Sequence, residues 1–505
     1  MNITNVLTYL EDAHARCPEK TAYVGESSAY TFDEVYLFSR RAGSCLANKG
    51  IYAEPVAVLM EKSPEMITAF FGCVYGGCYY VPFDAEMPRF RIELMLETLG
   101  ARVMIVDDTT EEFAKTLPFE GEILRWRDMI ASEENTAALQ TVRAAHIDTD
   151  PLYIVFTSGS TGVPKGVIAC HRSVIDYIEN LSDVLGFSHD TVFGNQSPLY
   201  FDACLKELYP TLKFGATTYL IPKALFSFPV KLVEYLNEHR INTVCWVVSA
   251  LTFISAVGTF KTVKPEFLRT VAFGSEVFPI KQFNRWREAL PNAVFTNLYG
   301  PTEATGMCCY YRVDRDFDEG DVIPIGRPFA NTQILLLNEE NRRCGVGEPG
   351  EICVRGTSLT LGYYRNPEKT AAAYVQNPLN DRYNELIYRT GDIARYNENG
   401  ELVYISRKDF QIKHMGHRIE LGEIEVNVHR LPSIALCCAV YDRARAKIVL
   451  YYTGDATLSD VTSALKERLP RYMLPNRTEK LDVMPLTANG KIDRAALTKR
   501  AEENN

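Results

Sequence analysis

The chain has 505 residues and a net charge of −10, from 54 basic and 64 acidic side chains. Hydrophobic residues make up 46% of it, which is enough for large cores and too much for a disordered or collagen-like chain. The acidic balance argues against nucleic acid or an anionic membrane as partner, because affinity for polyanions comes from clustered lysines and arginines. The 13 scattered cysteines, with no secretory leader before them, predict reduced thiols and a cytoplasmic protein.

The first half of the chain alternates short apolar runs with helix-like stretches. Strand-like runs occupy residues 55–60, 79–82, 103–106, 216–221, 243–248, 270–273 and 294–298. Alternation of this kind is typical of βαβ units and a mostly parallel sheet. The uncharged stretch 66–83 contains glycines and a proline, so it predicts a buried helix followed by a strand rather than a membrane span.

The second half changes pattern twice. From residue 323 short strands with turn signals predict a β-rich subdomain over about 323–405. After residue 409, strand-like runs at 436–441 and 448–452 precede an amphipathic stretch at 459–469. We therefore expect an α/β protein with a large N-terminal domain, residues 1–408, and a small, mobile α+β C-terminal domain, residues 409–505.

The most specific motif is residues 153–167, where an apolar run enters a loop rich in glycine and hydroxyl side chains. Small residues expose backbone N–H groups, hydroxyls add donors and one lysine neutralises charge, as a polyphosphate requires. The spacing differs from that of a Walker A loop. The candidate phosphate-binding residues are Thr157, Ser158, Gly159, Ser160, Thr161 and Lys165.

This run resembles the phosphate loop of the adenylate-forming superfamily, which includes acyl-CoA synthetases, luciferases and the adenylation domains of nonribosomal peptide synthetases. Segments 297–305, 388–392, 407–425 and 485–491 are similar to further motifs of that family and occur in the same order. The resemblance spans nearly the whole chain. It implies ATP and Mg²⁺ as cofactors and a C-terminal domain that rotates between two reactions.

The resemblance also assigns roles to single residues. Asn297 and Tyr299 would contact adenine, Thr302 the α-phosphate and Glu303 the magnesium ion. Asp392 would accept from the ribose hydroxyls, Arg407 would bridge ribose and phosphate, Asp409 would be the hinge and Lys491 the catalytic lysine. The residue types suit these roles, since Mg²⁺ prefers hard oxygen ligands. A carboxylate that attacks ATP meets like charge, so one positioned charge-stabilising group is worth about 2.7–4 kcal/mol.

For the acyl donor, Asp202 lies in a segment similar to the one in which amino-acid-activating members hold the α-ammonium group. Alternatively, Asp202 is a surface acid that pairs with Lys206 at i,i+4. By the same resemblance the substrate side chain would be surrounded by Ala203, Lys206, Trp246, Ala272, Gly274, Leu298, Gly306 and Met307, with Lys491 at the carboxylate end. Trp246 favours a small substrate. Lys206 either points inward and favours an acidic or hydrogen-bonding substrate, or points outward and pairs with Glu207.

A looser similarity, over 209–250 and 271–279, is to stand-alone D-alanine–carrier protein ligases, although Gly274 stands where those ligases typically have cysteine. We expect an amino-acid–carrier protein ligase that forms aminoacyl-AMP and pyrophosphate, then acylates the phosphopantetheine thiol of a separate carrier protein. D-alanine or another small amino acid is the first substrate to test. An acyl- or aryl-CoA ligase and a catalytically silent nucleotide-binding protein are the alternatives.

Overall fold

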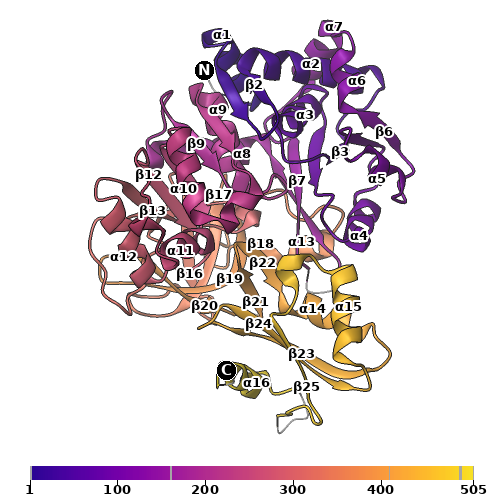
Figure 1. Ribbon diagram of the computed structural model, residues 1–505. Coiled ribbons are helices and arrows are strands. Elements are labelled where there is room, and N and C mark those ends of the chain that lie inside the picture. Colours follow the sequence, from indigo (N-terminus) through magenta and orange to yellow (C-terminus); the bar gives the residue numbers. More distant parts are fainter. Residues whose placement is uncertain (1–2, 160–161, 409, 488–491, 504–505) are drawn as a thin grey trace. The chain divides into compact units, whose positions relative to one another are not determined.

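The computed structural model describes residues 3–159, 162–408, 410–487 and 492–503 (Figure 1). The chain divides into two compact units. The first comprises Met1–Asp84, Ala101–Val155 and Gly166–Lys408, and the second comprises Ala85–Gly100, Phe156–Lys165 and Asp409–Asn505. Two segments that were expected in the N-terminal domain thus group with the C-terminal residues. The two-domain division at residues 1–408 and 409–505 stays a prediction.

A six-stranded sheet has the order β6-β5-β3-β4-β7-β8. Strands β3, β6 and β7 of this sheet are labelled in Figure 1. Its strands are β3 (Pro55–Leu59), β4 (Tyr79–Phe83), β5 (Val103–Val106), β6 (Glu122–Arg125), β7 (Pro151–Thr157) and β8 (Lys165–Cys170). The pairs β3–β4, β3–β5, β4–β7 and β5–β6 are parallel, as βαβ units predict.

The uncharged stretch 66–83 forms part of a buried helix and then a strand, as predicted. Helix α3 (Pro64–Tyr75) begins after Ser63, whose hydroxyl accepts a hydrogen bond from the Met66 N–H group, and Pro64 occupies the first helical position. Every residue of α3 except Glu65 is buried. Among the described residues, no helix is both long and apolar enough to cross a membrane.

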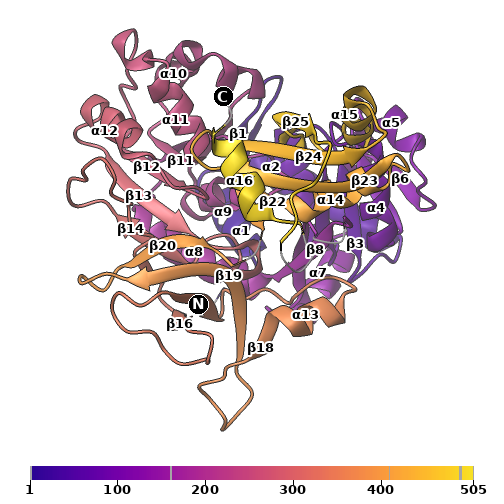
Figure 2. The same ribbon diagram turned by 90° about the horizontal axis from the view of Figure 1, so that it is seen from below.

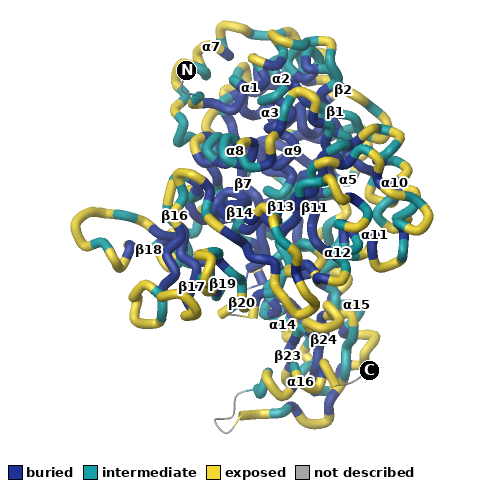
Figure 3. The backbone as a smooth tube through the Cα atoms, turned by 90° about the vertical axis from the view of Figure 1, so that its left-hand side faces the viewer, coloured by how far each residue is buried: buried dark blue, intermediate teal, exposed yellow. Residues whose placement is uncertain are grey.

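A nine-stranded sheet has the order β15-β14-β13-β12-β11-β9-β10-β1-β2. Its strands are β1 (Thr21–Val24), β2 (Ala29–Thr31), β9 (Val192–Asn195), β10 (Thr217–Leu220), β11 (Thr243–Val247), β12 (Thr270–Gly274), β13 (Val294–Tyr299), β14 (Cys309–Arg312) and β15 (Arg327–Pro328). The six strands from β13 to β1 run parallel, and β2, β14 and β15 are antiparallel at the two edges. Strands β11 and β13 belong to the buried interior (Figure 3).

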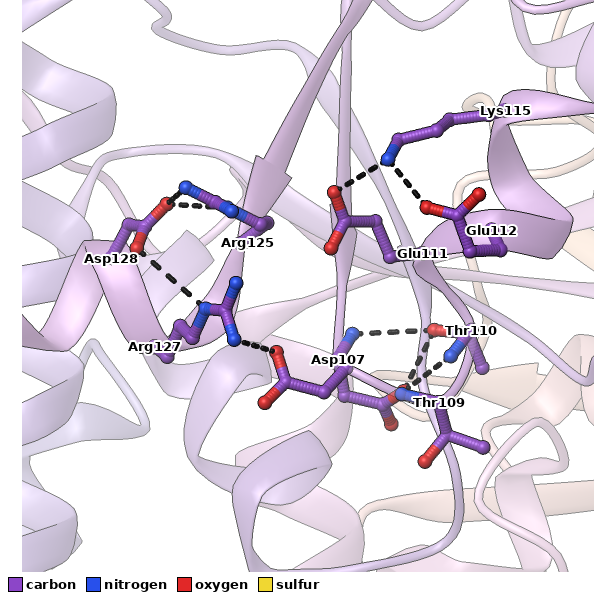
Figure 4. A network of polar contacts seen from close by, with 10 residues as sticks. Asp107, Thr109, Thr110, Glu111, Glu112, Lys115, Arg125, Arg127 and Asp128 are labelled. Atoms are coloured by element: carbon purple, nitrogen blue, oxygen red, sulfur yellow. Dashed lines mark hydrogen bonds and ion pairs between the residues drawn. The ribbon is translucent and has the colours of Figure 1, made fainter.

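Helices of the first unit pack on these sheets. They include α1 (Leu7–Arg16), α2 (Phe32–Asn48), α5 (Glu111–Lys115), α6 (Trp126–Ala131), α7 (Thr136–Ala145), α8 (His171–Leu185), α9 (Leu205–Phe214), α10 (Pro229–Glu238), α11 (Val248–Ala256) and α12 (Ile280–Ala289). Ion pairs such as Lys115 with Glu111 and Arg125 with Asp128 lie near β6, at the edge of the six-stranded sheet (Figure 4). Because they are partly exposed, they contribute little to stability.

The predicted β-rich subdomain is an antiparallel sheet in the first unit. Its order is β16-β17-β19-β18, and β20 pairs with β19. The elements are β16 (Thr332–Leu337), β17 (Gly350–Gly356), α13 (Pro367–Ala373), β18 (Tyr374–Gln376), β19 (Leu386–Tyr396) and β20 (Leu402–Arg407). The long strand β19 and its partner β20 bring residues 392 and 407 opposite one another.

The second unit has the α+β character expected of the C-terminal residues. Its elements are α4 (Arg89–Leu99), β21 (Gln411–His414), β22 (His417–Glu420), α14 (Leu421–His429), β23 (Ile434–Asp442), β24 (Lys447–Gly454), α15 (Leu458–Arg468), β25 (Arg477–Lys480) and α16 (Arg494–Glu503). Strands β23, β24 and β25 form one sheet, and α16 packs against β23 (Figure 2). All 13 cysteines of the chain are unpaired thiols.

Candidate functional site

The first group of predicted site residues lies where β13 ends and in the turn that follows. Asn297 is buried near the end of β13, and its side-chain amide donates to the carbonyl oxygens of Ile323 and Pro324 at 3.4 and 2.9 Å. These bonds hold residues 323–324, where the chain enters the β-rich subdomain, against β13. Tyr299 is the last residue of β13. The role of Asn297 and Tyr299 in binding adenine stays a prediction.

A buried carboxylate, Asp392, forms the centre of this group. The Tyr299 hydroxyl donates to Asp392 Oδ2 at 2.5 Å, and Arg407 Nη1 donates to Asp392 Oδ1 at 3.0 Å and to the Thr390 carbonyl at 2.7 Å. Burial, followed by the charge of Asp392, raises the pKa of the Tyr299 hydroxyl, so it remains a donor at neutral pH. Both carboxylate oxygens are therefore held in place, as a residue that must accept hydrogen bonds from a ligand requires.

Glu303 is fully buried in the short helix η4 (Thr302–Ala304). The Tyr363 hydroxyl donates to its Oε1 at 2.7 Å, and the Thr360 N–H group donates to its carbonyl oxygen at 3.0 Å. Tyr363 in turn pairs through its backbone with Val167, two residues after the predicted phosphate-binding lysine, Lys165. The glutamate is thus fixed through a tyrosine to the start of β8.

The chemistry of these side chains fits ATP with Mg²⁺. A carboxylate oxygen of Glu303 is a hard ligand of the kind that Mg²⁺ prefers. The Thr302 hydroxyl has no hydrogen-bond partner among the described residues, and it can donate to a phosphate oxygen. The assignment of Glu303 to the metal and of Thr302 to the α-phosphate stays a prediction.

The described part of the predicted phosphate loop belongs to the second unit. The Ser158 hydroxyl donates to the Arg418 carbonyl at 2.8 Å, and the Gly159 N–H group donates to Glu423 Oε2 at 3.2 Å. Thr157 Oγ1 is enclosed and has no hydrogen-bond partner among the described residues. The loop thus already presents one backbone donor to a carboxylate, which is the behaviour that anion binding requires.

Two further features shape this loop. A side chain at Gly159 would place its Cβ atom 2.1 Å from the Val163 carbonyl oxygen, so only glycine fits there. Glu423 also forms an ion pair with Arg91 of α4, and both side chains are at least 95% buried. The predicted residues Ser160, Thr161, Asp409 and Lys491 lie outside the described residues.

Asp202 begins the short helix η1 (Asp202–Cys204), which runs directly into α9. Ala203 beside it is partly buried. Lys206 lies in the first turn of α9 and is only 4% exposed, and the described residues offer it no ion pair with Asp202 or Glu207. The two surface pairings that the sequence left open are therefore wrong, and Lys206 is an interior residue.

Charged and polar groups lie near Lys206. Asn195 Nδ2 donates to Glu207 Oε2 at 3.2 Å, and Lys62 Nζ lies 3.3 Å from the carbonyl oxygens of Asn195 and Gln196. Burial raises the pKa of Glu207 to about 7 against the attraction of Lys206, and burial lowers the pKa of Lys62 to about 8. Lys62 and Asn195 were not predicted as site residues, because neither lies in a recognisable motif.

The predicted position of Trp246 is wrong. Trp246 pairs with Phe273 in the sheet, whereas Gly274 pairs with Val247 and Leu298. Since paired residues share a face and successive residues alternate, Trp246 lies on the face opposite to Ala272, Gly274 and Leu298. Its indole N–H group donates to the Gly194 carbonyl at 2.7 Å, and its ring packs edge-on against Phe226 in a separate core.

Val247 therefore occupies the place predicted for Trp246. It is 9% exposed and lies beside Gly274 on the same face. Alternation along the strand was the signal that could have identified it, but the run 243–248 is apolar throughout. A one-residue error of this kind exchanges the two faces of a strand.

The remaining predicted side-chain residues lie together. Ala272, Leu298 and Met307 belong to one buried core. Gly274 has no room for a side chain, because an added Cβ atom would lie 2.3 Å from the Leu298 carbonyl oxygen. Gly306 has a positive φ of 86°, which favours glycine. The structure thus brings these residues near one end of β12 and β13, and their contact with a substrate stays a prediction.

The parallel sheets, the β-rich subdomain and the fixed Asp392 and Glu303 carboxylates define an adenylate-forming enzyme. Residues 10–364 match the family described as AMP-binding enzyme, and the chain belongs to this family. It is 33% identical over 501 residues to tyrocidine synthase 3 of Brevibacillus parabrevis, a match that covers 98% of this chain and 8% of the relative. It is 32% identical over 493 residues to bacitracin synthase 1 of Bacillus licheniformis, a match that covers 96% of this chain and 9% of the relative.

Among solved structures, the fold is similar to PA1221, described as a nonribosomal peptide synthetase protein that contains adenylation and peptidyl carrier protein domains. The TM-score is 0.83 at 26% identity, and the match covers 99% of this chain and 98% of the other. The chain therefore spans a small part of the two large synthases and nearly the whole of the PA1221 chain.

Proposed function

We propose that the protein activates an amino acid with ATP and then transfers it to a carrier protein in the cytoplasm. In the first step an oxygen of the amino acid's carboxylate bonds to the α-phosphorus of ATP, and the bond to pyrophosphate breaks. In the second step a phosphopantetheine thiol of a separate carrier attacks the acyl carbon, AMP leaves and the thiol proton is released. The acceptor distinguishes this enzyme from an acyl-CoA ligase.

The observation that carries the proposal is the fixed Asp392 in a chain of the AMP-binding family. Its two carboxylate oxygens, held by Tyr299 and Arg407, are suited to accept hydrogen bonds from the two ribose hydroxyls. Arg407 would then also lie within reach of phosphate. A fixed acceptor pair loses little freedom on binding, so the nucleotide is oriented at low entropic cost.

One further residue supports an amino acid as the acyl donor. Asp202 would bind the α-ammonium group, and a carboxylate about 4 Å from an ammonium is worth about 4 kcal/mol at an effective dielectric constant of 20 before desolvation. Lys491 would stabilise the negative charge as the substrate carboxylate approaches phosphate. Mg²⁺ at Glu303, when bound, would neutralise phosphate charge.

Pyrophosphate exchange with a panel of D- and L-amino acids tests the first step. We expect exchange with one amino acid or a few similar ones, and loss of it in Asp202→Ala and Lys491→Ala. The control is Asp183→Ala, since Asp183 is an exposed acid on α8. The proposal would be refuted if no amino acid supported pyrophosphate exchange while fatty or aryl acids did.

The acceptor is tested separately with a carrier protein that bears phosphopantetheine and with free CoA. We expect acylation of the carrier and no acyl-CoA. Acyl-CoA formation instead would make the protein a CoA ligase, and ATP binding without pyrophosphate release would make it a silent nucleotide-binding protein.

A further inference from the structure

An interior cation lies one helical turn beyond Asp202. Lys206 is 4% exposed, and its ammonium group has neither a hydrogen bond nor an ion pair with another described residue. Transfer of an ammonium from water to a protein interior is costly unless an anion or several acceptors compensate it. The chain therefore keeps a cation at this position whose partner is absent from the described residues.

The surrounding charges do not supply that partner. Asp202, Lys62, Lys206 and Glu207 are the charged groups of the cluster, and the attraction of both lysines lowers the pKa of Glu207 against the effect of burial. Lys62 faces two backbone carbonyls, those of Asn195 and Gln196, and Glu207 accepts from the Asn195 amide. With all four groups ionised the cluster is neutral, and it gains one positive charge when Asp202 binds the α-ammonium group of a substrate.

We infer that Lys206 binds a carboxylate on the side chain of the activated amino acid, so that the substrate is acidic. This inference rests on the proposed function, in which Asp202 binds the α-ammonium group. Asp202 and Lys206 lie four residues apart across the junction of η1 and α9, on successive turns of the chain. A short acidic amino acid, with its ammonium and side-chain carboxylate a few bonds apart, bridges such a pair.

Other side chains leave the charges unbalanced. A cationic side chain would be repelled by Lys206, and an apolar side chain would offer the Lys206 ammonium group no acceptor. An amide could accept a hydrogen bond from Lys206 but would not neutralise it. Hydrogen bonds between charged groups are the stronger ones, so the acid should exceed its amide by about tenfold to hundredfold in kcat/KM.

The experiment is pyrophosphate exchange by the full chain with aspartate, glutamate, asparagine, glutamine and alanine, each as both enantiomers. Lys206→Met removes the charge and keeps an unbranched side chain. Lys213→Met is the matched control, because Lys213 lies on the same helix and already pairs with Glu179 at 2.8 Å. Thermal melting of each variant reports whether it folds.

We expect an acidic amino acid to be the best substrate of the wild type and of Lys213→Met. In a folded Lys206→Met variant, kcat/KM for the acid should fall by about tenfold to hundredfold, and that for the matching amide should change little. If Lys206→Met does not fold, the wild-type panel alone decides.

Two other results would overturn the inference. Pyrophosphate exchange with alanine or another neutral amino acid, and none with aspartate or glutamate, would refute the acidic substrate and leave the proposed function intact. An unchanged acid-to-amide ratio in folded Lys206→Met would remove Lys206 from substrate selection. Silence with all amino acids and exchange with fatty or aryl acids would instead refute the proposed function itself.

Discussion

Replacing Glu207 with glutamine should change how stability depends on pH. Glu207 is fully buried, and burial raises its pKa from 4.5 to about 7. The folded state therefore binds the proton more tightly than the unfolded state. The contribution of this group to stability is fully present below about pH 4.5 and is lost as the pH rises towards 7.

The size of the effect follows from the two pKa values. The interval from 4.5 to about 7 corresponds to at most about 3 kcal/mol of stability, at 1.36 kcal/mol for each pKa unit. Glutamine is similar in shape and does not titrate, and it keeps an oxygen to accept from Asn195 Nδ2. Between about pH 5 and pH 8, wild type should therefore lose up to about 3 kcal/mol relative to Glu207→Gln.

Urea unfolding at several pH values, followed by circular dichroism, measures this difference. The control is Glu234→Gln, because Glu234 is an exposed glutamate on α10 and should follow the wild type. Stability curves of wild type and Glu207→Gln that stay parallel from about pH 5 to pH 8 would show that Glu207 titrates like an exposed acid. The rise of the Glu207 pKa by burial would then be wrong.

Three further substitutions test other parts of the structure. Gly274→Ala should destabilise the protein by about 1–3 kcal/mol in urea unfolding, because its Cβ atom would meet a backbone carbonyl at 2.3 Å; unchanged stability would contradict the close strand contact. Arg91→Met should cost about 3–5 kcal/mol, since it leaves Glu423 buried without its ion-pair partner, and a melting temperature equal to that of wild type would exclude this buried pair. Trp246→Phe should cost about 1–3 kcal/mol by removing the donor to the Gly194 carbonyl and should leave the order of preferred amino acids unchanged; a new order would place the indole on the substrate face.

Much of the fold could be predicted because its strands are short apolar runs between turns. The predicted run 103–106 coincides with β5, and the run 270–273 falls one residue short of β12. The β-rich character of the residues after 323 was also visible, since turn signals separate its strands. Local patterns were sufficient wherever an element's identity depends on its own composition.

The direction of a side chain was harder to predict than the strand that carries it. Strand β11 is buried on both faces, so its sequence is apolar without alternation, as is usual in parallel sheets. Only the pairing of Trp246 with Phe273 and of Val247 with Gly274 shows which residue lies on which face. Lys206 is a similar case, because its burial results from the packing of α9 and not from its neighbours in sequence.

Segments that are distant in sequence were the third difficulty. Residues of α4 were expected to belong with the N-terminal sheets, yet Arg91 pairs with Glu423, more than 300 residues later. No local pattern distinguishes an arginine that forms a buried ion pair from one that faces solvent. The motif 153–167 indicated a phosphate loop, but not that a glutamate of α14 would accept from Gly159.

The two faces of β11 and β12 have a consequence for how such enzymes diversify. One face carries Trp246 and Phe273 in a tightly packed aromatic layer, while the other presents Val247, Ala272 and Gly274. Neighbouring positions in the same short strand are thus under different packing constraints. If the second face contacts the substrate, mutations there would change the substrate preference, while the aromatic layer on the first face would keep the protein folded. Such a division between the two faces is a favourable starting point for laboratory evolution.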